Sequence, residues 1–438
     1  MAAFLVLQAA RFGDLVQSKR LILTLQEQGR VCLGVDAGLA PLARLLYPGA
    51  EVFGLRLHGQ PGAAALAENR TVFRQWRETA FQAVYNCNFS PVTAAICRLF
   101  EPEIVMGYRP AQAPESAILR SQWARLAFRL SERRLCSPLN LVDFWGHFAS
   151  SPLAAEQVNP LARPGGQGLG VVLAGRESRR SLPLPLLASI LQTLFGLLDG
   201  PEVYLLGAKA EQPAAHKLQR LLPAKIQEKV NDLSGKTDWP GLIHAVEGLD
   251  ALLTPDTGVM HLAAHLGVPV LAFFLSSAWC HETGPYGRGH VVWQTSRSCA
   301  PCLESAPCRH NVACLEALQG KELLRSLAAA VRPEARIRVQ LPDTLQFWRS
   351  DLDALGGVLR LEGGQDAHAP QRAFTRALLA EFLHLPEQSG AHAAGTASPE
   401  LIDPEERAAL RRWLCHDADW MLPPGRYCLC PPRPCVFW

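Results

Sequence analysis

Short apolar runs alternate with longer amphipathic stretches along the first 110 residues. Phe4–Leu7 is predicted to be a buried strand, and the helix expected after it carries Leu15, Ile22 and Leu25 on one face, at i, i+7 and i+10. Further strands are predicted at 31–35, 51–55, 83–86 and 104–107. Strands separated by helix-length segments are typical of parallel βαβ units.

A segment rich in Pro and Gly, 159–170 (NPLARPGGQGLG), interrupts this rhythm, which then restarts and continues to about residue 330. Two consecutive βα regions joined by a linker predict an α/β protein with two facing Rossmann-like lobes. The predicted division is 1–160 for the first lobe, 161–330 for the second, and 331–438 for a C-terminal extension of unknown role. Helices are expected in the extension at 374–385 and 404–413.

Composition narrows the classes of protein that this pattern allows. The 438 residues are 48% apolar and 19% charged, which excludes a disordered chain and a coiled coil. No window approaches the roughly 20 apolar residues that cross a bilayer. The apolar run at 4–7 is too short for a signal peptide, so a cytoplasmic protein is expected. A net charge of +3 does not indicate a nucleic-acid partner.

The strongest local motif is the segment 251–274, ALLTPDTGVMHLAAHLGVPVLAFF. It predicts a strand that runs into Asp256, Thr257 and Gly258, then a helix from about Val259, then a second strand. Small residues at such a turn let a ligand approach the backbone, and the free N–H groups of the helix start favour an anion. A phosphate or diphosphate is the expected ligand. The alternative is that Asp256 or Thr257 only caps the helix.

Two histidines, His261 and His265, lie four residues apart on the predicted helix. They resemble half of a zinc HExxH motif, but position 262 is Leu and the glutamate base is absent. We therefore do not predict a metal there. His261 is expected near the helix start, where it would donate to a ligand oxygen, and His265 is expected to be packed.

Gly13 and Asp14 follow the first predicted strand, in a loop at the carboxyl edge of the sheet, where ligands bind in open α/β folds. A carboxylate at that place would take a proton from a hydroxyl nucleophile if it stayed ionised and within hydrogen-bond reach. The alternative is that Asp14 caps the following helix.

A basic stretch covers 109–134, and within it Arg125, Arg129 and Arg133 fall at i, i+4 and i+8. One interpretation is a solvated helix face. The other is a patch for anionic lipid headgroups or a phosphorylated acceptor, which would bring the protein into peripheral contact with a membrane.

Four of the thirteen cysteines form a group, Cys299, Cys302, Cys308 and Cys314, with spacings of two, five and five residues between them. Four thiols are enough for a tetrahedral structural zinc or an iron–sulfur cluster. The alternative is reduced thiols that pack a loop. A second group at 415–435 belongs to the extension and allows either metal binding or an ordered cap.

These segments, in this order, resemble glycosyltransferase family 9, the heptosyltransferase family of lipopolysaccharide assembly. The resemblance extends over about residues 3–330. It is carried by FLVLQAARFGDLVQ at the start, by VVLAGRESRRSLP with Arg180, and by the long segment from LSGKTDW to VLAFF. The GPYG sequence at 284–287 and the cysteine group also occur in many members.

The resemblance implies a GT-B fold, an inverting mechanism and a nucleotide-activated sugar donor. It implies that Asp14 is the general base. The positions that it implies for donor binding are Arg180, Asp256, Thr257, Gly258 and His261. The two predicted lobes, residues 1–330, contain no DxD motif, so no cofactor is expected to be required for catalysis.

The predicted function is therefore the transfer of a heptose-like sugar. The donor would be an ADP-heptose-like nucleotide sugar, and the acceptor a lipid-linked lipopolysaccharide core or related surface glycan. The reaction is expected at the inner face of the cytoplasmic membrane. Two alternatives are a non-catalytic nucleotide-sugar-binding or assembly protein of the same fold, and a metal-dependent interaction module built on the cysteines.

Overall fold

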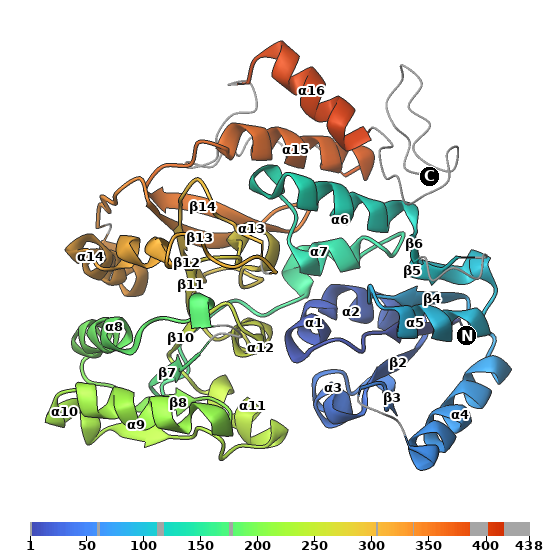
Figure 1. The fold of residues 1–438 in the computed structure, drawn as a ribbon, viewed down its shortest axis with the longest axis horizontal. Helices are drawn as coiled ribbons and strands as arrows, with labels where there is room; N and C mark the ends of the chain where they lie inside the picture. The colour runs from blue at the N-terminus through green and yellow to red at the C-terminus, as the bar shows by residue number, and fades with distance from the viewer. Residues whose placement is uncertain are drawn as a thin grey trace.

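The computed structural model describes residues 2–58, 62–111, 118–174, 178–303, 305–335, 337–385 and 402–415. These residues form two α/β lobes, each built around its own sheet. In Figure 1 the first lobe, in blue and cyan, lies to the right of the second, which runs from green to orange. Within the described ranges no helix combines the length and apolar character needed to cross a bilayer.

The first sheet has six strands in the order β3-β2-β1-β4-β5-β6. Its strands are β1 (Ala3–Leu7), β2 (Arg30–Asp36), β3 (Ala50–Leu55), β4 (Ala83–Asn86), β5 (Val105–Pro110) and β6 (Ile118–Arg120). The first five are parallel, and β6 pairs with β5 in the antiparallel sense. Every residue of β1 is buried, as expected for a parallel strand covered by helices on both faces.

Helices cover both faces of this sheet (Figure 1). They are α1 (Phe12–Gln17), α2 (Lys19–Gln28), α3 (Ala40–Leu46), α4 (Ala63–Glu78), α5 (Pro91–Ile96), α6 (Gln122–Glu132) and α7 (Leu141–Gly146).

The loop predicted at Gly13 and Asp14 is wrong, because both residues lie in the first turn of α1. The helix expected next is divided in two at Ser18. The Ser18 hydroxyl donates to the Asp14 carbonyl at 2.9 Å and accepts from the Gln8 side chain at 2.9 Å. A serine that bonds back to the carbonyl four residues earlier commonly bends a helix.

The second sheet has eight strands in the order β14-β13-β12-β11-β10-β7-β8-β9. Its strands are β7 (Leu169–Val172), β8 (Val203–Leu206), β9 (Val230–Asp232), β10 (Ala251–Pro255), β11 (Val270–Phe274), β12 (Val291–Thr295), β13 (Leu345–Leu352) and β14 (Gly357–Gly363). Its helices are α8 (Leu184–Leu197), α9 (Gln212–Leu221), α10 (Ala224–Gln227), α11 (Trp239–Glu247), α12 (Gly258–Leu266), α13 (Cys280–Thr283) and α14 (Lys321–Val331).

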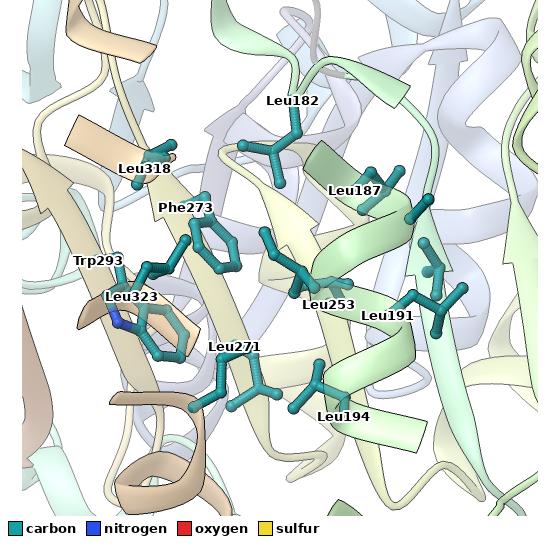
Figure 2. Packing of buried hydrophobic residues seen from close by; sticks show 14 of the residues in the cluster. Leu182, Leu187, Leu191, Leu194, Leu253, Leu271, Phe273, Trp293, Leu318 and Leu323 are labelled. Carbon is teal, nitrogen blue, oxygen red and sulfur yellow. The ribbon is translucent and has the colours of Figure 1, made fainter. Parts of the chain in front are cut away.

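A large apolar core lies between this sheet and helices α8, α9 and α14. Figure 2 shows leucines of α8 packed toward Leu253, Leu271 and Phe273 of the sheet. The rings of Phe273 and Trp293 stack with centroids 4.8 Å apart. The Trp293 indole N–H, which would be costly to bury unpaired, donates to Ser326 Oγ at 2.7 Å.

The chain beyond residue 330 contributes to both lobes. Strands β13 and β14 extend the second sheet as antiparallel additions at its edge. Helices α15 (Ala369–Phe382) and α16 (Pro404–Cys415) instead pack on the first lobe, where Leu379 and Leu414 join the core of Leu21 and Leu25. The limits 1–160, 161–330 and 331–438 stay predictions, and the structure adds that the second sheet continues past the limit at 330.

Candidate functional site

The turn between β10 and α12 is built as the motif predicts. Thr257 is the N-cap of α12, and its hydroxyl accepts from the Met260 N–H at 3.4 Å, which confirms capping by Thr257. The helix ends at Gly267, which takes the left-handed conformation with φ 76°. Asp256 does not cap the helix, so its carboxylate is available for other contacts.

Arg180 reaches this turn from the loop that follows β7. It forms an ion pair with Asp256 and also donates from Nη2 to the Asp256 carbonyl at 3.2 Å. The Thr283 hydroxyl donates to the Asp256 carboxylate at 3.3 Å. Arg180 Nε is buried and has no hydrogen-bond partner among the residues that the structure describes. The site therefore offers a buried cationic donor in addition to the backbone N–H groups of α12.

Burial determines the charge of the two titratable groups at the turn. It raises the pKa of Asp256 to about 6, against the opposing effect of the Arg180 guanidinium. Burial, assisted by Arg180, lowers the pKa of His261 to about 3, so the imidazole is neutral at pH 7. His261 Nε2 lies 3.9 Å from the Asp256 carboxylate. A neutral imidazole keeps one N–H donor, as the prediction for His261 requires.

Helix α1, which carries Asp14 in its first turn, approaches the same turn from the other lobe. A Cβ built on Gly13 would lie 3.2 Å from His261 Cδ2 and 3.4 Å from Gly258 Cα, so the first turn of α1 touches the first turn of α12. Phe12 lies directly on Gly258 and packs against Trp239 at 5.2 Å between centroids. The first turn of the helix that carries the predicted base and the turn predicted to bind the donor are therefore in contact between the lobes, although they are far apart in the sequence.

Sequence reasoning missed Phe12 and Thr283, which complete this arrangement. Phe12 is the residue that brings α1 against Gly258, and Thr283 is the neutral donor to Asp256. Only Phe12 could have been identified from the sequence, because it is an aromatic residue directly before the predicted site residues Gly13 and Asp14. Thr283 lies on the four-residue helix α13, for which the chain has no periodic pattern.

The arginines of the basic stretch are largely engaged within the molecule. Arg129 is only 9% exposed and pairs with Glu132 at 3.3 Å. The Arg133 guanidinium lies 5.2 Å from the Trp413 ring of α16. Arg134 binds Glu282 of the second lobe at 2.6 Å. The interpretation as a solvated face therefore fails for Arg129, which is buried, while Arg133 is exposed and lies against α16. Through Arg134 the same segment also connects the two lobes.

The cysteine group does not form the predicted metal site. Across the described ranges, no set of three or more His, Cys, Asp or Glu side chains is placed to hold a metal ion. Cys302 Sγ instead lies 3.3 Å from Ser276 Oγ, and Cys308 Sγ accepts the Val312 N–H at 3.3 Å. Cys299 is exposed and Cys314 is buried. The four sulfurs thus have unlike environments, and the cysteines at 428, 430 and 435 lie outside the described residues.

Comparison with known proteins supports the resemblance in the second lobe. The family model "Glycosyltransferase family 9 (heptosyltransferase)" matches residues 196–312, which include the turn at 256–261. Lipooligosaccharide heptosyltransferase 2 of Haemophilus influenzae is 28% identical over 78 residues, 18% of this chain and 22% of that protein. Lipopolysaccharide heptosyltransferase 1 of Pseudomonas aeruginosa is 41% identical over 64 residues, 15% of this chain and 18% of that protein. The matched segments thus span about a fifth of each relative, and they confirm the resemblance to the family.

Two solved structures share the fold over both lobes. The family 9 glycosyl transferase from Veillonella parvula superposes with a TM-score of 0.58 at 14% identity, covering 76% of this chain and 98% of that one. The E. coli heptosyltransferase WaaC with ADP gives a TM-score of 0.50 at 17% identity, covering 65% and 91%. The predicted fold class, an α/β GT-B fold with two facing Rossmann-like lobes, is confirmed.

Proposed function

We propose that the protein is an inverting glycosyltransferase that moves a heptose-like sugar from a nucleotide-diphosphate donor to a lipopolysaccharide core or related surface glycan. The observation that carries this proposal is the contact between the Gly13–Asp14 turn of one lobe and the Gly258–His261 turn of the other. The second turn lies in the segment that matches the heptosyltransferase family.

On the donor side, the first N–H groups of α12 and the buried Nε of Arg180 are suited to a diphosphate. Negative charge grows on the diphosphate as the bond to the sugar breaks, and positive groups fixed in place stabilise that charge. Thr257 and Gly258 would lie nearest the phosphates, while Asp256 and His261 would meet sugar or phosphate oxygens. The family names of the relatives favour a heptose, and the ADP in one solved neighbour favours an ADP-heptose-like donor.

On the acceptor side, Asp14 would take the proton of the attacking hydroxyl. The hydroxyl oxygen forms the new bond to the anomeric carbon, and the bond from that carbon to the diphosphate oxygen breaks. The nucleoside diphosphate leaves with the electron pair. A single displacement from the face opposite the leaving group inverts the configuration at the anomeric carbon, and such a step requires only one base. The proposal requires no cofactor.

Replacing the proposed base tests this mechanism. We expect Asp14→Asn to lower kcat by at least a thousandfold with ADP-heptose and a heptose-deficient core oligosaccharide, while the Kd for ADP-heptose changes less than twofold. Glu27→Gln is the matched control, because Glu27 is an exposed carboxylate on α2. Unchanged turnover of Asp14→Asn would exclude Asp14 as the base.

The alternative function, a non-catalytic nucleotide-sugar-binding protein of the same fold, makes a different prediction. It requires ADP-heptose to raise the melting temperature of the wild-type chain without transfer to any core acceptor. A thermal-shift comparison of ADP-heptose with other nucleotide sugars, followed by an assay for released ADP, separates the two.

We also propose that the enzyme works at the cytoplasmic face of the membrane, in peripheral contact with it, where a lipid-linked acceptor is found. The best-suited surface is on α4, where Arg70, Arg74 and Arg77 are exposed at i, i+4 and i+7. None of the three has an ion-pair partner in the described part of the chain. Cosedimentation with anionic but not with neutral phospholipid vesicles, lost on changing all three to Gln, is the expected result.

A further inference from the structure

One exposed aromatic side chain, Phe89, lies on the first lobe in the loop between β4 and α5. The side chain is 58% exposed, although burying a phenylalanine removes a large apolar surface from water and so stabilises a fold. A single exposed apolar residue is ordinary in a soluble protein. The exposure of Phe89 therefore indicates no function by itself. Its place in the fold and the side chains that hold its ring have to be considered.

The Phe89 ring is held by a buried arginine, Arg120, and a half-buried tyrosine, Tyr108. The Arg120 guanidinium lies over the ring, 4.9 Å from its centroid, and over the ring of Phe128 at 4.3 Å. Arg120 is only 6% exposed. Tyr108 meets the Phe89 ring edge-on, with centroids 5.5 Å apart. The ring is therefore held in one orientation by an arginine and a tyrosine, while more than half of its side chain stays open.

The loop that carries Phe89 is tied to the loop that leads to Asp14. The Asn88 side chain accepts from the Ala9 N–H at 3.0 Å and donates to the Leu7 carbonyl at 2.8 Å. Leu7 and Asn86 are partners in the parallel ladder of β1 and β4. Phe89 thus projects at the carboxyl edge of the first sheet, at the strand next to the one that delivers Asp14.

We propose that Phe89 is a stacking surface for a sugar ring of the acceptor glycan. This inference rests on the proposed function. The donor is assigned to α12 and Arg180 of the second lobe. A rigid aromatic surface at the edge of the first sheet from which the chain continues into α1 is therefore suited to the acceptor. Sugar rings present an apolar C–H face to the negative face of an aromatic ring, and a rigid ring loses little entropy on binding.

The experiment compares Phe89→Ala and Phe89→Trp with the wild-type chain, using ADP-heptose and a heptose-deficient core oligosaccharide. Stacking contributes about 1–1.5 kcal/mol, which is roughly a tenfold change in affinity. We expect Phe89→Ala to raise the KM for the oligosaccharide about tenfold, with kcat and the KM for ADP-heptose within twofold of wild type. Phe89→Trp keeps a flat aromatic face and should restore the acceptor KM.

Leu303→Ala is the matched control, because Leu303 is exposed at 68% on the second lobe. An acceptor KM of Phe89→Ala within twofold of wild type would overturn the inference, and so would a rise confined to the donor KM. Calorimetric titration with the oligosaccharide alone gives a readout that does not need turnover. If the wild-type chain binds the oligosaccharide through Phe89 but transfers no sugar, the proposed function is contradicted. The proposal that Phe89 stacks on a sugar ring is then still supported.

Discussion

At the scale of single residues, glycine is required at position 258 by a contact with the other lobe and not by the conformation of its own turn. A Cβ built there would lie 2.3 Å from Phe12 Cδ1 and 2.8 Å from Cε1, closer than real contacts allow. The close approach of the other lobe, and not a left-handed backbone, therefore requires glycine at this position. The distance between the proposed base and the proposed donor turn depends on that contact.

We therefore expect Gly258→Ala to destabilise the protein by about 1–3 kcal/mol, as overpacking does, and to lower kcat at least tenfold, because α12 is pushed away from Asp14. Adding Phe12→Ala should recover most of the stability, which a double-mutant cycle from denaturant unfolding measures. Gly196→Ala in α8 is the control, since a Cβ there meets nothing within 4 Å and should be neutral or stabilising. If Gly258→Ala proves as stable as Gly196→Ala, the predicted clash with Phe12 is contradicted.

At the scale of elements, a buried polar cluster joins parts of the chain that no sheet connects. Asp143 of α7 accepts from Arg20 of α2 at 2.7 Å, from the Tyr286 hydroxyl at 2.6 Å and from the Gly357 N–H of β14 at 2.7 Å. Arg20 also donates to the Leu355 carbonyl at 2.9 Å. The cluster thus fixes the first lobe to the turn between β13 and β14 and to the GPYG segment of the second.

Removing the carboxylate leaves a buried arginine without its partner. We expect Asp143→Ala to cost about 3–5 kcal/mol of unfolding free energy, and Tyr286→Phe, which removes one hydroxyl, about 1 kcal/mol. The double variant Arg20→Met with Asp143→Ala should be more stable than Asp143→Ala alone. Urea unfolding at pH 7.5 measures all of them, and an equal cost for Asp143→Ala and Tyr286→Phe would contradict this account.

At the scale of the whole molecule, desolvation keeps five histidines neutral among the residues that the structure describes. Burial lowers the pKa of His147 and His290 to about 4, that of His261 and His265 to about 3, and that of His281 well below its usual value. In the unfolded chain these rings titrate near 6.5, so the unfolded state binds more protons below that pH. Their contribution to stability is present above pH 6.5 and is lost as the pH falls toward 4.

Each histidine contributes up to about 1.4 kcal/mol per pH unit in this window. Asp256 acts in the opposite sense, because its raised pKa of about 6 lets the folded state bind a proton there. We expect the unfolding free energy to fall by several kcal/mol between pH 7 and pH 5. His290→Phe should reduce the number of protons taken up on unfolding by about one, and so make the unfolding free energy depend less steeply on pH. An unfolding free energy that does not change between pH 7 and pH 5 would refute the prediction.

Much of the local structure follows from the chain alone. The parallel strands at 4–7, 31–35, 51–55 and 83–86 were predictable as short apolar runs, because a strand covered on both faces buries consecutive side chains. The helix predicted at 374–385 is found at Ala369–Phe382. The turn at 256–258 was predictable because small and capping residues are required where a strand meets a helix. That turn lies within one of the three segments that carry the family resemblance.

Contacts between distant segments were decided only by the tertiary structure. Gly13 meets His261, α15 returns to the first lobe, β13 and β14 complete the second sheet, and Arg134 pairs with Glu282. The cysteine spacing also suggested a shared site that the fold does not form among the described residues. Periodicity reports which face of an element is buried, but it does not report what covers that face. The element that covers a face depends on how the two lobes pack, and no local pattern in the chain encodes that choice.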